Sequence, residues 1–465
     1  MKQVDVAIIG AGPGGYVAAI RLAQFKKNVV VIEKENVGGV CLNIGCIPSK
    51  AMIHASEIYQ KMHHAAEIGF TVGSVGIDVK KIQNWKEGIV KRLTGGIGQL
   101  FKAHKIDLIT GEARFKTRRM LLVKSAGGEE EVAFDSAIIA TGSSSAIIPG
   151  FKPEGKYVGT STEGLSYSEI PKELCVIGGG YIGLEIGSLY AGLGSAVTVV
   201  EATASLLPGT DPELVQVVAR ELRRRNVKVL LNTKAVSWKE MGGKAKILVS
   251  KEGKEEELTS DKILVAVGRV PNTKNLDLEK IGVALDAKDF IKVNDQLKTN
   301  IDGIYAIGDC AGQPMLAHKA SKEGLVAAAV IAGKRELYDV RAMPAVIFTT
   351  PEIATVGLDE AEAKAEGYTV KTGKFPFVAS GKALASGETD GFVKMVVDAK
   401  TDRVLGLQMV GAGVSNLIGE AALAIEMGAT SEDMARTVHP HPTLTETLME
   451  AAETVHGTAI HIFQK

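Results

Sequence analysis

The 465-residue chain has little of several features that mark other classes of protein. Only 5% of its residues are aromatic, and its 54 basic and 54 acidic residues cancel, which argues against base-stacking surfaces and against a basic field for nucleic acid or anionic membranes. Its four cysteines are too few for the disulfide framework of a secreted protein. Its apolar runs are too short to cross a membrane, and no signal-peptide pattern precedes the first apolar strand. We therefore expect a cytoplasmic protein without nucleic-acid or membrane partners, in which a disulfide would take part in chemistry.

Glycine is abundant, with 52 residues, and strand and helix patterns alternate along the chain. Residues 4–9 predict a buried parallel strand, followed by a glycine-rich turn, a helix and a second strand at 29–33. The same order recurs between residues 174 and 201, and residues 107–135 and 226–258 predict antiparallel insertions. From about residue 342 the pattern changes to mixed strands and helices. The predicted fold is α/β, with two Rossmann-like dinucleotide-binding domains carrying antiparallel insertions, plus a C-terminal α+β domain.

The first glycine-rich turn places Gly10, Gly12 and Gly15 on the positions of a dinucleotide fingerprint. The first glycine permits a tight turn, the second lets the backbone approach a pyrophosphate, and the third lets the helix pack closely on the strand. Glu33 ends the next strand, where a carboxylate can bind ribose hydroxyls. A lone glycine turn is weak evidence, but this one has the strand, the helix and the acid in place.

The second turn repeats the pattern with Gly178, Gly180 and Gly183, and Glu201 again ends the following strand. A carboxylate at that point favours the free 2′-hydroxyl of NAD and repels the 2′-phosphate of NADP. Residues 202–204 offer no basic group, so the sequence predicts NAD at this turn.

Cys41 and Cys46 lie in a glycine-containing stretch after the first unit's second strand. On an ideal helix their Cα atoms would be about 8.6 Å apart, whereas a disulfide needs about 4.4–6.8 Å. If they pair, the backbone must be bent, and Gly45 and Pro48 are placed to allow that. Two buried structural thiols or half of a metal site are the alternatives, although no further cysteine pair supports tetrahedral zinc. We expect no metal.

Near the C-terminus, His439, His441 and Glu446 gather at the start of a predicted helix. Thiol–disulfide exchange needs a base and an acid, and a histidine held by a carboxylate can serve as both. From the spacing alone, a helix-capping or packed histidine is at least as well supported.

Several motifs together are specific to one family. They are the run 38–50, the second fingerprint Gly-Gly-Gly-Tyr-Ile-Gly-Leu-Glu, the segments 306–309 and 315–320, and the terminal His-Pro-Thr-Leu-Thr-Glu. With them the chain resembles the pyridine nucleotide–disulfide oxidoreductases from about residue 4 to residue 463, and in particular the members that reoxidise dihydrolipoyl groups. The resemblance implies FAD at the first fingerprint and NAD at the second. Val40 and Pro440 depart from the family's commonest residues, at positions that do not supply the chemistry.

The resemblance also implies catalytic roles. Cys41 would exchange with the lipoyl disulfide, and Cys46, nearer the flavin, would form the charge-transfer thiolate. His441, oriented by Glu446, would act as the base from the other subunit, which implies an obligate homodimer. A glutathione reductase should show arginines for a 2′-phosphate near residue 201, and a mercuric reductase a second cysteine pair near its C-terminus; the sequence has neither.

Cofactor contacts carry over residue by residue from the same resemblance. Lys50 would lie by the flavin N5 and pair with Glu185. The FAD contacts expected are Gly10, Gly12, Gly15, Glu33, Lys50, Ala113, Thr141, Gly142, Ser143, Asp309, Met315, Leu316, Ala317 and His318. The NAD contacts expected are Gly178, Gly180, Gly183, Glu185, Glu201, Ala235 and Gly268.

The resemblance divides the chain into an FAD-binding domain (1–145), an NAD-binding domain (146–268), a central domain completing the FAD site (269–340) and a C-terminal dimerisation domain (341–465). The partners implied are a second copy of the chain, lipoyl domains, and the acyltransferase core of 2-oxo acid dehydrogenase complexes. A role limited to docking on that core is the competing hypothesis, but a purely structural subunit would not need both cysteines and the histidine–glutamate pair. Cys175 is expected to be a buried thiol in a strand. Cys310 has no assigned role.

Overall fold

The computed structural model describes residues 2–464, and its first parallel sheet joins strands that are far apart in the sequence. The order is β3-β2-β1-β6, and β17 pairs in parallel with the end of β6. β4 and β5 extend the other end of β6 as an antiparallel meander. The strands are β1 (Lys2–Ile9), β2 (Val29–Glu33), β3 (Asp107–Thr110), β4 (Glu112–Thr117), β5 (Met120–Ser125), β6 (Gly128–Ile139) and β17 (Ile304–Ala306). Residues 6–8 of β1 are fully buried, as expected for a strand covered on both faces.

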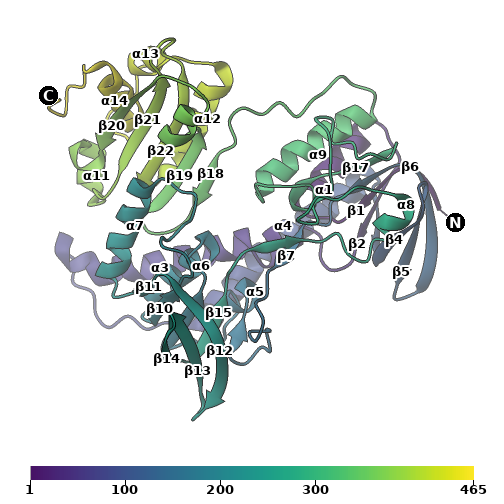
Figure 1. Cartoon of the computed structure of the whole chain (residues 1–465), viewed down its shortest axis with the longest axis horizontal. Helices are drawn as coiled ribbons and strands as arrows, with labels where there is room; N and C mark the ends of the chain where they lie inside the picture. The colour runs from purple at the N-terminus through teal and green to yellow at the C-terminus, as the bar shows by residue number, and fades with distance from the viewer. Residues whose placement is uncertain (1, 465) are drawn as a thin grey trace.

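Helices cover one face of this sheet. α1 (Pro13–Gln24) packs beside α9 (Ala317–Ile331), and both share an apolar cluster with β1 and β2 (Figure 1). The short α2 (Gly39–Asn43) and the long helices α3 (Cys46–His64) and α4 (Val79–His104) lie in the chain between β2 and β3. The other face packs against β4, β5 and residues 276–291, which include α8 (Leu278–Ile281).

The second parallel sheet has the order β11-β10-β9-β15-β8. Its strands are β8 (Val158–Gly159), β9 (Glu173–Ile177), β10 (Ala196–Val200), β11 (Lys228–Leu230) and β15 (Lys262–Val265). Its helices are α5 (Ser161–Gly164), α6 (Tyr181–Gly192) and α7 (Pro212–Arg224). An antiparallel sheet of β12 (Thr233–Met241), β13 (Lys244–Lys251) and β14 (Lys254–Ser260) is inserted before β15. A two-stranded ribbon, β7 (Ser143–Ser145) with β16 (Arg269–Pro271), connects the two units, and α3 packs on α6.

The C-terminal part contains an antiparallel sheet of its own, with the order β18-β19-β22-β21-β20. The strands are β18 (Ala345–Ile347), β19 (Glu352–Gly357), β20 (Val370–Pro376), β21 (Phe392–Asp398) and β22 (Val404–Gly411). The helices are α10 (Glu360–Ala365), α11 (Gly381–Ser386), α12 (Val414–Met427), α13 (Ser431–Arg436) and α14 (Glu446–His456). α12 and α14 cover the sheet and bury a separate apolar core with it.

The predicted fold class is confirmed: two units of the strand–turn–helix–strand type each carry antiparallel strands, and an α+β domain follows. The strand at 29–33 has the predicted bounds. α1 begins at Pro13, inside the predicted glycine-rich turn, because proline is well suited to a first helical turn. The division at residues 145, 268 and 340 stays a prediction. Within residues 2–464 no helix is long and apolar enough to cross a membrane.

Candidate active site

The two glycine turns have the same internal geometry. Gly10 and Gly178 adopt φ of 104° and 110°, in the region that favours glycine. A Cβ on Gly15 would lie 1.9 Å from the carbonyl oxygen of Gly10, and a Cβ on Gly183 would lie 2.1 Å from that of Gly178. The first and third glycines of each turn are therefore required by the chain itself.

The second glycine of each turn is not required in this way. Gly12 has φ of −70° and Gly180 has φ of −77°, values that any residue adopts. A Cβ on Gly12 would come no closer than 4.0 Å to another atom, and a Cβ on Gly180 would meet nothing within 4 Å. The space beside these two glycines is open to a group outside the chain, and the N-termini of α1 and α6 provide backbone N–H groups suited to a phosphate. The residues present therefore fit two bound dinucleotides.

A carboxylate supports each turn from the end of the neighbouring strand. The Ala11 N–H donates to Oε2 of Glu33 at 2.7 Å, and the Gly179 N–H donates to Oε2 of Glu201 at 2.6 Å. Oε1 of Glu201 also accepts from the Thr203 N–H at 2.7 Å. Both acids thus lie beside the turns, where the ribose of a dinucleotide would be. Their proposed ribose contacts stay predictions.

The two cysteines lie on either side of a break between helices. α2 ends at Asn43, and α3 begins at Cys46. Between them Gly45 adopts φ of −134° and ψ of −112°, and a Cβ on it would lie 2.9 Å from the carbonyl oxygen of Val40. The bend that a disulfide would need is therefore present, and Gly45 makes it possible.

In this structure Cys41 and Cys46 are free thiols joined by a hydrogen bond, and they differ in acidity. The hydrogen bond from Cys41 and the nearby Lys50 ammonium lower the pKa of Cys46 to about 7, against the effect of burial. The same hydrogen bond, together with burial, raises the pKa of Cys41. Cys46 is therefore the more acidic thiol of the pair, and Cys41 is the less acidic one.

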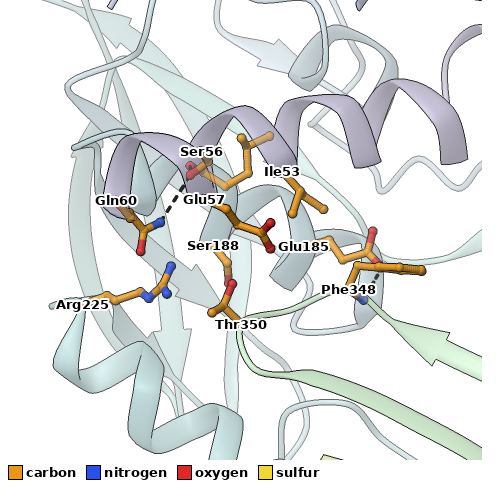
Figure 2. A pocket seen from close by; sticks show the side chains of 10 residues that line it. Ile53, Ser56, Glu57, Gln60, Glu185, Ser188, Arg225, Phe348 and Thr350 are labelled. Atoms are coloured by element: carbon orange, nitrogen blue, oxygen red, sulfur yellow. Dashed lines mark hydrogen bonds between the residues drawn. The ribbon is translucent and has the colours of Figure 1, made fainter. Parts of the chain in front are cut away.

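Glu185 connects three parts of the chain next to these cysteines. Its carboxylate is 5% exposed, Oε2 accepts from the Lys50 Nζ at 2.8 Å, and Oε1 accepts from the Phe348 N–H at 2.9 Å. The Lys50 Nζ also lies 4.2 Å from the centroid of the Phe348 ring. Figure 2 shows Glu185 and Phe348 at one end of a small cavity that α3 and α6 line with Glu57 and Ser188. The Lys50–Glu185 pair implied by the resemblance is present, but Glu185 faces Lys50 and Phe348, so its contact with NAD stays a prediction.

The predicted FAD contacts at residues 141–143 lie near Asp309. The Ser143 Oγ donates to Oδ2 of Asp309 at 2.6 Å, and the Arg269 Nε donates to the Ser143 Oγ at 2.7 Å. Gly142 and Gly268 both have positive φ, of 69° and 122°, in the two segments that the ribbon β7–β16 brings together. The Thr141 Oγ1 donates to the carbonyl oxygen of Asn272, which fixes the same junction.

Residues 315–318 form the entrance to α9. Leu316 is its N-cap, Met315 precedes the cap, Ala317 is the first helical residue, and the His318 Nε2 lies 2.7 Å from the carbonyl oxygen of Pro344. Ala113 and Ala235 are different, because their side chains pack into apolar clusters on β4 and β12. Only their backbone could face a cofactor.

The two C-terminal histidines have different surroundings. The His441 Nδ1 lies 2.9 Å from Oε1 of Glu446, whose Oε2 accepts from the Thr443 N–H at 2.8 Å, and the His441 side chain is 77% exposed. The His439 side chain is 5% exposed and pairs with Glu420 at 2.8 Å. The packed-histidine alternative therefore describes His439, and His441 is the one available to a substrate.

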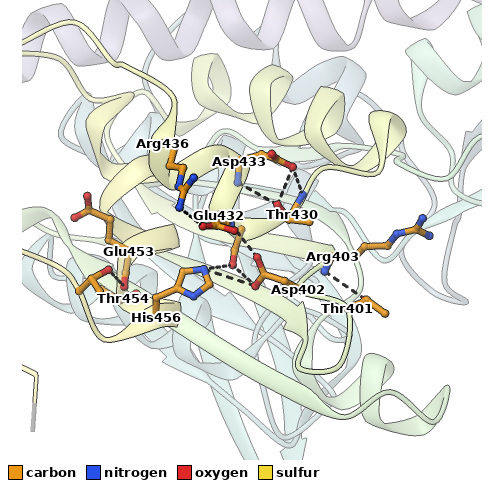
Figure 3. A network of polar contacts seen from close by, with 12 residues as sticks. Thr401, Asp402, Arg403, Thr430, Glu432, Asp433, Arg436, Glu453, Thr454 and His456 are labelled. Carbon is orange, nitrogen blue, oxygen red and sulfur yellow. Dashed lines mark hydrogen bonds and ion pairs between the residues drawn. The ribbon is translucent and has the colours of Figure 1, made fainter.

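Helix α14, which begins at Glu446, is anchored at its far end. The Ser431 Oγ donates to Oδ1 of Asp402 at 2.6 Å and lies 2.8 Å from the His456 Nε2 (Figure 3). Among the described residues of one chain, no hydrogen bond or ion pair joins His441 to the cysteines.

Sequence reasoning missed two contributors: Phe348, whose N–H holds Glu185, and a buried ion pair, Lys319–Glu323, in α9. No sequence signal points to Phe348, because its partner is 163 residues away. The spacing of a lysine and a glutamate four residues apart in a helix could have indicated the pair.

A thiol pair of unequal acidity, beside one of two dinucleotide sites, can pass electrons between a substrate dithiol and a nicotinamide. This combination defines the class of flavoprotein disulfide oxidoreductases. Residues 4–324 match the family model described as pyridine nucleotide-disulphide oxidoreductase, and residues 343–452 match the dimerisation domain of the same family. The chain belongs to this family, and the second match supports a homodimer.

Relatives match along the whole chain. The dihydrolipoyl dehydrogenase of Thermus scotoductus is 48% identical and covers 100% of both chains. That of Geobacillus stearothermophilus is 44% identical over 100% of this chain and 98% of its own. Among solved structures, LpdA from Mycobacterium tuberculosis has a TM-score of 0.91 at 28% identity, covering 97% of this chain and 99% of its own. The HOCl-induced flavoprotein disulfide reductase RclA from Escherichia coli has a TM-score of 0.86 at 28% identity, with the same coverage. The protein is an FAD-dependent oxidoreductase that uses FAD and NAD.

Proposed function

We propose that this protein oxidises protein-bound dihydrolipoyl groups to the lipoyl disulfide and passes the electrons through Cys41 and Cys46 and FAD to NAD⁺. The observation that carries the proposal is the unequal thiol pair, in which the pKa of Cys46 is lowered to about 7 next to Lys50. The substrate is supported by full-length identities of 48% and 44% to proteins named dihydrolipoyl dehydrogenase.

The proposed reaction starts at His441, which takes a proton from the dihydrolipoyl dithiol while Glu446 holds the imidazole by its Nδ1. The substrate thiolate attacks the sulfur of Cys41 in the oxidised Cys41–Cys46 pair, and Cys46 leaves as a thiolate. The second substrate thiol then displaces Cys41, so that the lipoyl disulfide forms and the enzyme keeps the dithiol. Lys50 stabilises the negative charge on Cys46. When bound, FAD would supply the two-electron chemistry that returns the Cys41–Cys46 dithiol to its disulfide and reduces NAD⁺.

The finer partner assignments belong to the same proposal. The match to the dimerisation domain supports a partner subunit that supplies His441 and Glu446. Lipoyl domains and the acyltransferase core of 2-oxo acid dehydrogenase complexes are the partners that the proposed substrate implies. A cytoplasmic location stays a prediction from the sequence.

The test is NAD⁺ reduction by dihydrolipoamide, followed as NADH absorbance, with NADP⁺ in a parallel cuvette. We expect turnover with NAD⁺ and little with NADP⁺, because Glu201 faces the site without a basic neighbour among residues 202–204. Cys46→Ser should abolish turnover but leave the flavin reducible by NADH. Cys175→Ala is the matched control, since Cys175 is buried in β9 away from the site. Normal dihydrolipoamide oxidation by the Cys46→Ser variant would contradict the mechanism, and no turnover by the flavin-loaded wild type would contradict the substrate.

A further inference from the structure

Helix α9 carries a buried ion pair that the proposed reaction does not use. The Lys319 Nζ lies 2.9 Å from Oε1 of Glu323, and the side chains are 4% and 5% exposed. Burial raises the pKa of Glu323, against the effect of Lys319. A buried ion pair is often no more stabilising than apolar side chains of similar volume, so net stability is a weak explanation for it.

The pair binds the backbone of one short loop. The Lys319 Nζ donates to the carbonyl oxygens of Gly308 and Gly312 at 3.3 and 3.0 Å. Oε2 of Glu323 accepts from the Gly308 N–H at 2.6 Å. Gly308 has φ of 73°, so the chain leaves β17 through a sharp turn. Loop 308–312 is therefore tied at both ends to one turn of α9.

This loop presents Asp309, whose Oδ2 accepts from the Ser143 Oγ at 2.6 Å. Residues 315–318 lead into the same helix, which packs closely on α1: a Cβ on Gly324 would lie 2.6 Å from the carbonyl oxygen of Gly14. The segments that the resemblance assigns to FAD are thus positioned from α9. Lys319 and Glu323 set the distance between loop 308–312 and α9.

We propose that Lys319 and Glu323 are positioning residues for FAD, which hold loop 308–312 so that Asp309 and the entrance to α9 face the cofactor together. This inference rests on the placement of FAD in the proposed function. The two side chains supply the hydrogen-bonding groups that the loop backbone needs. Lys319 donates to two carbonyl oxygens, and Glu323 accepts from an N–H.

The experiment measures the FAD affinity of the apoprotein and, separately, its thermal unfolding. Lys319→Met/Glu323→Met replaces the pair by apolar side chains of similar length but leaves three backbone groups of Gly308 and Gly312 without these partners. The unfolding midpoint should therefore fall somewhat, and FAD affinity is measured well below it. Loss of the hydrogen bonds to charged groups should weaken FAD binding about 10- to 100-fold. Lys86→Met is the matched control, because Lys86 is 2% exposed and its Nζ also donates to a backbone carbonyl, that of Leu165, at 2.9 Å. Its FAD dissociation constant should stay within about twofold of the wild type, since it removes a similar bond outside the loop.

A double variant that binds FAD within twofold of the wild type would overturn the proposal, as would equal weakening in the Lys86→Met control. If the double variant does not fold, Lys319→Met gives the second reading, because Glu323 can take up a proton and leave no unpaired charge. Weakened FAD binding in that variant supports the proposal, and unchanged binding overturns it. Failure of wild-type apoprotein to bind FAD would instead contradict the proposed function.

Discussion

Replacing the second and third glycines of the NAD turn should separate cofactor binding from folding. A Cβ at residue 183 would lie 2.1 Å from the carbonyl oxygen of Gly178 and 3.1 Å from Cγ1 of Val176, and because the closer atom is backbone it cannot adjust easily. Overpacking costs about 1–3 kcal/mol and occasionally more. For Gly183→Ala we expect a loss of about 3 kcal/mol, which lowers the melting temperature by roughly 6–12 °C at about 2–4 °C per kcal/mol.

Gly180→Ala should behave differently. Its backbone, with φ of −77° and ψ of 179°, accepts alanine, and the added methyl would meet no protein atom within 4 Å. A compatible Gly→Ala change stabilises by about 0.4–1 kcal/mol, and at this N-cap position about the same amount is lost. The melting temperature should stay within about 3 °C of the wild type. The methyl occupies the approach to the α6 N-terminus, so NAD⁺ affinity should fall about 10- to 100-fold.

Calorimetric titration of the oxidised enzyme with NAD⁺ and thermal unfolding followed by circular dichroism give the two readings. Gly187→Ala is the control in the same helix, since a Cβ there would make only ordinary contacts, 3.5 Å from Val176. It should change neither affinity nor, beyond a small gain, stability. Wild-type NAD⁺ affinity in the Gly180→Ala variant would refute the assignment of this turn to a pyrophosphate. Destabilisation equal to that of Gly183→Ala would refute the packing argument.

Three further changes test the rest of the site. Cys41→Ala removes the hydrogen bond that lowers the pKa of Cys46 most, so that pKa should rise above about 7. Alkylation of the reduced protein by iodoacetamide should then shift to higher pH, and an unchanged pH profile would contradict this. Glu446→Gln leaves His441 without its carboxylate and should lower kcat for dihydrolipoamide about 10²- to 10⁴-fold, with NADH reduction of the flavin as the control. Glu201→Gln should raise the KM for NAD⁺ about tenfold and leave that for dihydrolipoamide unchanged, and equal effects on both would argue against a ribose contact.

Local patterns were sufficient to predict the two glycine turns and their strands. Glycine spacing, a following helix and an acid at the next strand end depend on only about thirty consecutive residues. The choice between the histidines depended instead on a distant residue: Glu420 on α12 pairs with His439 and removes it from solvent. Spacing within the motif contains no information about that contact.

The long helix α4 was also missed, for a different reason. It contains Gly88, Gly95, Gly96 and Gly98, and each glycine lowers helix stability by about 1 kcal/mol relative to alanine. The buried Val90, Ile97 and Phe101 show that tertiary packing of one apolar face outweighs this local preference. A propensity argument could not have weighed packing partners that lie elsewhere in the chain.

The contacts of the Glu185 carboxylate limit how the chain can be divided into fragments. It lies in the second dinucleotide unit, yet its two oxygens are bound by Lys50 from the first unit and by the backbone of Phe348 from the C-terminal part. A fragment ending before Phe348 would leave one oxygen of a buried acid without a donor, and a fragment lacking Lys50 would leave its charge uncompensated. The two units repeat one architecture, but they are not interchangeable modules. We expect engineered exchanges of a whole nucleotide unit between relatives to succeed only when the lysine and the backbone at this junction are transferred with it.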